Sequence, residues 1–274
     1  MLEFLEYDFM LNAITASLLA SIACGIIGSY IIVKRIVFIT GGIAHTAYGG
    51  IGLGYLLGFN PLIGAVGFSL GAAGFISFMR KRNNENEDIL IGLMWAFGMA
   101  LGVLFISFVP GYVPDLMSYL FGNILTISGT EIWLMVILDL VIVTIVAVLF
   151  KQLRAITFDE EFAQTTGLPV DKLYFLLMSL IAITIVVLIK LVGIILVIAL
   201  LSIPSAISVK FNKGLKSMMF VSVLLALAFM LVGLLLSYYL NLPSGSTIIM
   251  VAVFSYLLAA VINKYRFNSK NFAK

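Results

Sequence analysis

The chain contains one histidine, His45, and it lies inside a long apolar stretch. A neutral imidazole is a good ligand for zinc or manganese, and an ionisable residue at membrane depth usually faces the interior of a helix bundle or a water-filled path. His45 is about ten residues beyond the basic pair Lys34-Arg35, which corresponds to roughly 15 Å of helix and half of a ~30 Å hydrocarbon core. We therefore expect His45 at the midplane as a metal-pathway candidate. The alternative is an imidazole that only packs between helices.

Two further side chains bear on the chemistry. Asp139 lies midway along the apolar stretch 131–150, where a lone carboxylate is costly unless it is protonated, paired or facing water, so it is a second metal candidate. Cys24 is the only cysteine, which excludes an internal disulfide and a cysteine metal cluster. One His and one Cys cannot form a catalytic zinc site with three such ligands, and no His-Glu-x-x-His motif occurs. An intramembrane serine protease would need a serine partnered with a base, and the only histidine follows no such serine motif, so this class is disfavoured.

The sequence also lacks the glycine-rich phosphate-binding motif Gly-x-x-x-x-Gly-Lys-Ser/Thr. The chain is therefore not expected to bind ATP, and any ATP must be hydrolysed by a separate partner subunit. We expect no enzymatic activity and no cofactor in this chain itself.

The composition indicates which elements carry these residues. Hydrophobic residues make up 62% of the 274 residues, charged residues 11%, and the mean hydropathy is +1.18. Such values fit only an integral membrane protein, and they give no support to nucleic-acid binding. We expect an all-α polytopic protein with eight or nine transmembrane helices, forming a single transmembrane domain over residues 1–274. The predicted spans are 9–33, which is too long for a signal peptide, 36–58, 61–79, 88–109, 131–150, 172–189, 191–208, 217–240 and 245–262.

The basic residues predict the orientation of these spans. If the N-terminus is outside, all of the 16 lysines and arginines except Lys190 fall in cytoplasmic loops or at the C-terminus. Because positively charged loops stay inside, this asymmetry predicts a multi-pass plasma-membrane protein with a cytoplasmic C-terminus, in contact with lipid on its outer faces. Residues 58–61 and 241–245 are then tight outer hairpins, and the apolar segment 110–131 is a re-entrant or surface helix.

Small residues recur along the span that carries the histidine. On a helix, Gly42, Gly50, Gly54 and Gly58 lie on one face, together with Thr46. Such a stripe allows another helix to approach backbone to backbone, so we expect these glycines to mediate helix packing.

Two cytoplasmic segments present charge. Residues 157–163 begin with a Thr-x-x-Glu capping signature, and the expected short acidic helix ends at Gly167. After Pro204 the segment SAISVKFNKGLK is basic and is expected to form a second short helix. Contact with lipid headgroups would explain both segments equally well.

Four stretches, in order, resemble the permease subunits of the bacterial and archaeal zinc and manganese ABC importers. They are GGIAHTAYGGIGLGYLLGFNP, PDLMSYLFGNIL, FDEEFAQTTGLPVDKL and LVGIILVIALLSIPSAIS. The resemblance implies a type II ABC importer fold, a homodimeric pore, cytoplasmic ATPase subunits and an extracytoplasmic metal-binding protein. It also implies that a coupling helix follows Pro204, beside the helix from Phe158 to Gly167. Residues expected to couple the chain to the ATPase are Phe158, Glu160, Gly167, Pro204, Ser205 and Lys210.

One position departs from the pattern of that family. Many members have Gly-Asp-x-x-x-His in the second span, but Gly41 stands four residues before His45 here. Since manganese favours carboxylate oxygens and zinc accepts nitrogen-rich sites, the missing carboxylate favours zinc over manganese as the transported ion. The alternative function is a secondary metal carrier driven by an ion gradient, which would need ionisable residues in the spans. A purely structural scaffold would leave the midplane histidine unexplained.

Overall fold

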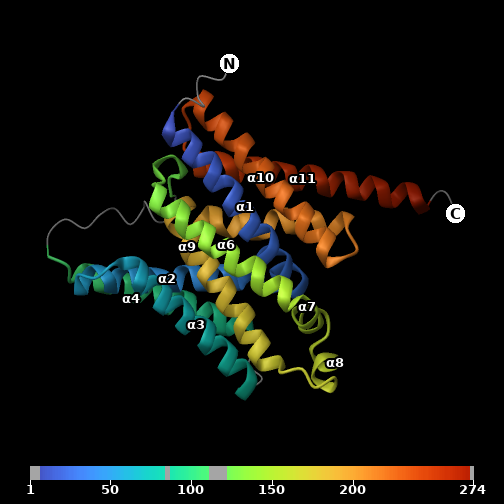
Figure 1. The fold of residues 1–274 in the computed structure, drawn as a ribbon, viewed down its shortest axis with the longest axis horizontal. Helices are drawn as coiled ribbons and strands as arrows, with labels where there is room; N and C mark the ends of the chain where they lie inside the picture. The colour runs from blue at the N-terminus through green and yellow to red at the C-terminus, as the bar shows by residue number, and fades with distance from the viewer. Residues whose placement is uncertain (1–6, 84–86, 111–121, 272–274) are drawn as a thin grey trace.

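The computed structural model describes residues 7–83, 87–110 and 122–271, and every regular element in these ranges is a helix (Figure 1). This confirms the all-α prediction. In chain order the elements are α1 (Asp8–Lys34), α2 (Val37–Leu57), α3 (Pro61–Asn83), α4 (Glu87–Ser107), the 3-10 turn η2 (Ile124–Thr126), α6 (Gly129–Val148), α7 (Phe150–Phe158), α8 (Glu160–Thr165), α9 (Val170–Phe211), α10 (Leu215–Leu240) and α11 (Ser244–Asn271).

Within the described residues, eight helical segments are long and apolar enough to cross a membrane. They lie in α1, α3, α4, α6, α10 and α11, and in the two parts of α9, Val170–Ile189 and Val192–Phe211. Their bounds agree with the predicted spans to within a few residues, except that α11 continues to Asn271. The predicted hairpins at 58–61 and 241–245 are also present, with left-handed backbone at Gly58 and at Asn241.

Helix α2 is the predicted span that is absent from these eight. Its 21 residues are long enough to span, but its glycines, threonines and histidine make it less apolar. Fourteen of the 21 residues are buried, because α2 packs against α3, α4 and α9. Neighbouring helices therefore shield α2 from lipid, so it does not need a uniformly apolar surface.

The long helix α9 is interrupted once. Gly193 has φ 78° and ψ 161°, a conformation that favours glycine, and it separates the two spans of α9. A Cβ added at Gly122 would lie 2.2 Å from the backbone nitrogen of Gly193, so the chain before η2 crosses directly over this bend. Close by, the Asn12 side-chain amide donates a hydrogen bond to the Ile127 carbonyl, 3.3 Å away, which ties this segment to α1.

The prediction of a separate short helix after Pro204 is wrong. Pro204 lies inside α9, which continues without a break to Phe211, and α10 begins at Leu215. A proline removes one backbone donor, but transmembrane helices tolerate this loss where neighbouring helices enclose them. The segment after Pro204 is therefore the inner end of a long helix.

The predicted start of the acidic helix is also wrong. Thr157 belongs to α7, where its hydroxyl donates to the Leu153 carbonyl at 2.6 Å. The residue that caps α8 is Asp159, whose extended backbone breaks the helix and whose side chain accepts a hydrogen bond from the Phe162 N–H at 2.9 Å. Asp159 therefore takes the capping role that Thr157 would have in an isolated peptide.

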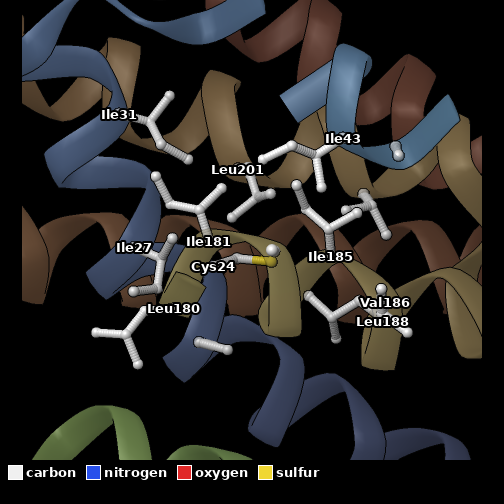
Figure 2. Packing of buried hydrophobic residues seen from close by; sticks show 14 of the residues in the cluster. Cys24, Ile27, Ile31, Ile43, Leu180, Ile181, Ile185, Val186, Leu188 and Leu201 are labelled. Carbon is white, nitrogen blue, oxygen red and sulfur yellow. The ribbon is translucent and has the colours of Figure 1, made fainter. Parts of the chain in front are cut away.

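The core lies between α1, α2 and α9. Figure 2 shows Cys24, Ile27 and Ile31 of α1 near side chains of α9 such as Ile181 and Leu201, with Ile43 of α2 beside them. These residues are fully buried or nearly so. The outer segment predicted at 110–131 and the polar loop 81–88 include residues 111–121 and 84–86, which lie outside the described part of the chain.

Candidate functional site

His45 lies near the middle of α2 and is half-buried against α4. Its imidazole stacks on the indole of Trp95, with ring centroids 4.3 Å apart and an interplanar angle of 15°. The Nδ1 atom is 3.1 Å from the Sδ atom of Met99. Trp95 and Met99 are four residues apart on α4, so one face of that helix supplies both contacts.

Glycines set the distance between α2 and α4. A Cβ added at Gly98 would lie 2.4 Å from the Cα of Thr46, and one added at Gly52 would lie 2.7 Å from the Gly102 carbonyl oxygen. The Thr46 hydroxyl also donates to the Met94 carbonyl on α4, 3.0 Å away. Backbone contact of this kind fixes the register of the two helices, and with it the position of α4 side chains around His45.

The predicted glycine stripe serves two neighbouring helices. Gly42 contacts Ile91 of α4, whereas Gly50 and Gly54 contact α3. An added Cβ would lie 2.0 Å from the Gly64 carbonyl oxygen at Gly50, and 2.6 Å from the Pro61 Cα at Gly54. Gly58 has a different role, because it ends α2 with φ 73° and has open space where a Cβ would be.

Position 41, where the family pattern has a carboxylate, faces Trp95. A Cβ added at Gly41 would lie 2.5 Å from a ring carbon of Trp95. The indole therefore fills the space that a longer side chain at position 41 would need. The absence of a carboxylate at position 41 and the stacking of Trp95 on His45 therefore occur together, because the same indole contacts both residues.

Asp139 is buried on α6, which packs against α1, α7 and α9. Its Oδ2 atom has no hydrogen-bond partner among the residues that the structure describes. Among the described residues, α6 shares no extensive contact with α2, so the structure does not bring Asp139 and His45 together. Within the same residues, no group of three or more His, Cys, Asp or Glu side chains is close enough to hold a metal ion.

The acidic segment around α8 forms an ion-pair cluster. The Glu160 carboxylate accepts hydrogen bonds from Lys34 at the end of α1 and from Arg80 near the end of α3. The Lys34 ammonium also donates to the Ile156 carbonyl at 3.1 Å, and the Arg80 guanidinium lies 4.2 Å from the centroid of the Tyr174 ring. These contacts place the ends of α1 and α3 on the same side of the bundle as α8, as the charge distribution predicts.

The remaining residues predicted to couple to the ATPase have unequal exposure. Phe158, at the end of α7, is 63% exposed, and Gly167 is exposed with a left-handed φ of 80°. Pro204 and Ser205 are buried, and the Ser205 hydroxyl would be 2.9 Å from a Cβ added at Gly28 of α1. Lys210 is partly exposed, with its ammonium 4.0 Å from the centroid of the Tyr256 ring.

The sequence alone did not identify the residues that contact His45 and Glu160. Trp95 and Met99 gave no signal, because an aromatic residue and a methionine are ordinary in an apolar span. Lys34 and Arg80 served only to predict the orientation of the spans in the membrane. The Gly98-x-x-x-Gly102 spacing was a usable signal for contact between α4 and α2.

Comparison with known proteins shows similarity along nearly the whole chain. The profile of the ABC 3 transport family matches residues 6–263. An uncharacterized membrane protein of Synechocystis sp. is 50% identical over 264 residues, covering 96% of this chain and 94% of that protein. The manganese transport system membrane protein MntC of Listeria monocytogenes is 31% identical over 255 residues, covering 93% and 91%. The solved structure of PsaBC from Streptococcus pneumoniae in complex with Fab has a TM-score of 0.83 at 31% identity and covers 94% of both chains.

Proposed function

Because this chain belongs to the ABC 3 transport family and is the permease of a metal importer, we propose that it conducts a divalent metal ion inward past His45, with zinc preferred over manganese. ATP hydrolysis on separate cytoplasmic subunits supplies the energy. An extracytoplasmic metal-binding protein delivers the ion, and two copies of the chain form the pore. The N-terminus is outside and the C-terminus is in the cytoplasm.

The observation that carries this proposal is the environment of His45. The only imidazole of the chain lies about 12 Å along α2, a helix roughly 32 Å long, so it is close to the middle of the membrane. An ionisable group is disfavoured at lipid-facing positions, and 14 of the 21 residues of α2 are buried by its neighbours. A site with few protein ligands suits an ion that must be released on the other side.

The preference for zinc follows from Gly41 and Trp95. Manganese sites are rich in carboxylate oxygen, whereas zinc is bound readily by nitrogen and sulfur. An added Cβ at Gly41 would lie 2.5 Å from the indole of Trp95, so a carboxylate one turn before His45 would require this ring to move. The relative from Listeria monocytogenes is named for manganese transport, so the proposal assigns a different ion preference to this chain.

The surface proposed to meet the ATPase combines exposed aromatic rings with charge. Phe158 and Phe162 are 63% and 62% exposed beside the acidic α8. A groove of about 570 Å³ lies along α8 and is lined by Arg80, Glu160 and Glu161, among others. Lys210 adds positive charge at the inner end of α9. Apolar anchors surrounded by complementary charge are typical of protein docking surfaces.

Uptake in vesicles tests the function. Vesicles containing the chain and its ATPase should accumulate zinc when the metal-binding protein and ATP are supplied, and vesicles without the ATPase should not. In His45→Ala, uptake per folded molecule should fall severely, because alanine fits the packed helix but offers no ligand. Thr40→Ala, which removes a polar group one turn earlier on α2, should transport normally.

Two outcomes would contradict the proposal. Uptake that follows a proton gradient and ignores ATP would favour the secondary carrier. If the imidazole only packs, His45→Ala would lower assembly stability by about 1 kcal/mol and leave uptake per folded molecule unchanged.

A further inference from the structure

The thioether of Met99 on α4 contacts the imidazole of His45 on α2. Its Sδ atom lies 3.1 Å from Nδ1 of the imidazole, and the two residues are 54 positions apart in the sequence. Helix register therefore creates this pair, which no local sequence motif contains.

The pair is held in place from both sides. Met99 lies within the contact region of α2 and α4, between the glycine contacts at Gly98 and Gly102 and the hydrogen bond from Thr46 to the Met94 carbonyl. Trp95 covers the face of the imidazole and directs its edge toward the sulfur. Nitrogen and sulfur therefore meet without rearrangement of the backbone.

The spacing of the two atoms suits a shared ion. With metal–nitrogen bonds of about 2.0–2.1 Å and metal–sulfur bonds of about 2.3 Å, two donors 3.1 Å apart subtend an angle of roughly 90° at one metal ion. A small rotation of the flexible Met99 side chain would open this angle toward the tetrahedral value that zinc prefers.

The chemistry of the two donors selects among ions. Thioether sulfur and imidazole nitrogen favour soft or borderline cations, whereas manganese favours carboxylate and water oxygen. The carboxylate that would favour manganese is absent at position 41, where the Trp95 ring packs against Gly41. Every donor beside His45 therefore points to the same class of ion.

From these contacts we infer that Met99 is a second protein ligand of the transported ion, together with His45, and that the site takes a thiophilic cation such as Zn²⁺ or Cd²⁺. This inference rests on the proposed function, because it assumes that the ion passes His45. It adds a ligand from α4 and makes that helix the determinant of ion preference.

The test compares Met99→Leu with the matched variant Met94→Leu on the same helix, in vesicles with the ATPase, the metal-binding protein and ATP. Leucine conserves volume, so both variants should fold. Met99→Leu should reduce uptake of Zn²⁺ and of Cd²⁺ by about tenfold or more relative to uptake of Mn²⁺, the scale seen when metal-site groups are removed. Met94→Leu should leave the ratio unchanged. Met99→Cys, which retains a sulfur donor, should keep the preference for Zn²⁺ and Cd²⁺ over Mn²⁺.

Failure of this inference differs from failure of the proposed function. If His45→Ala abolishes uptake but Met99→Leu lowers all three ions equally or lowers none, Met99 is not a ligand and the importer assignment stands. An equal loss would instead indicate that the sulfur only accepts a hydrogen bond from Nδ1–H. If the unaltered chain with its ATPase, its metal-binding protein and ATP takes up none of the three ions, the proposed function itself is wrong.

Discussion

Substitution of Glu160 by glutamine should destabilise the inner side of the bundle. The carboxylate accepts hydrogen bonds from Lys34 of α1 and from Arg80 of α3, so the charge of this residue links α8 to both helices. Glutamine keeps the size of the side chain and removes the charge. The Lys34 ammonium then retains the Ile156 carbonyl as an acceptor but loses its counter-charge.

The burial of the three side chains sets the magnitude. The Lys34 side chain is 8% exposed, that of Glu160 25% and that of Arg80 30%. Exposed pairs contribute about 0–1 kcal/mol, and breaking a fully buried pair costs about 3–5 kcal/mol. We expect Glu160→Gln to lower the free energy of unfolding by about 2 kcal/mol, mainly because the charge of Lys34 is left buried.

Thermal unfolding in detergent measures this effect. For a chain of this size, about 2 kcal/mol corresponds to a fall in Tm of roughly 4–8 °C. Glu161→Gln is the matched control, because Glu161 is exposed and adjacent, and such surface changes usually alter stability by less than about 0.5 kcal/mol. In the double variant Lys34→Met with Glu160→Gln, much of the loss should be recovered, since neither charge of that pair remains.

The pH dependence provides a second measurement. Burial acts to raise the pKa of Glu160, but the hydrogen bonds and charges of Lys34 and Arg80 outweigh it and lower the pKa below the ordinary value of 4.5. A lowered folded-state pKa gives stability that is present above the ordinary pKa and is lost as the pH falls through the folded value. The Tm difference between the unaltered chain and Glu160→Gln should therefore be constant above pH 4.5 and shrink below it. Equal Tm values for the glutamine variants at positions 160 and 161 would refute the reasoning.

Three further predictions concern packing and orientation. Gly41→Asp should lower the free energy of unfolding by about 1–3 kcal/mol, because the added Cβ meets Trp95. Adding Trp95→Ala should restore stability and shift uptake toward Mn²⁺. Unfolding and uptake assays check this, and a Gly41→Asp single variant as stable as the unaltered chain would contradict it. Gly50→Ala should lower Tm clearly while Gly67→Ala, with open space at its Cβ, should not. A cysteine at Asn60 should react with an impermeant thiol reagent in intact cells and be protected in inverted vesicles; the reverse pattern would overturn the topology.

The sequence was sufficient to predict most of the helices, because each span is a long apolar run that ends at charges, glycine or proline. It was insufficient where a local signal competes with tertiary structure. Pro204 reads as a helix boundary, but burial between neighbouring helices lets α9 continue through it. Thr157 reads as a capping residue, but α7 extends through it and Asp159 caps α8 instead.

The partners of His45 were unpredictable for a different reason. His45 and Met99 are 54 residues apart in the chain, and their contact depends on the register between α2 and α4. Glycines set that register, but their spacing in the sequence indicates only that two helices approach closely. The packing of α2 between neighbouring helices also explains why it is the least apolar of the predicted spans. A helix that carries an imidazole and many glycines needs neighbours on most of its faces, and α3, α4 and α9 supply them. The residues that reduce the hydropathy of α2 are therefore those that allow close packing, and close packing is what brings a sulfur atom of α4 to the histidine. A chain that used larger apolar residues in α2 would be a more conventional membrane span, but it would hold α4 too far away for Met99 to reach His45.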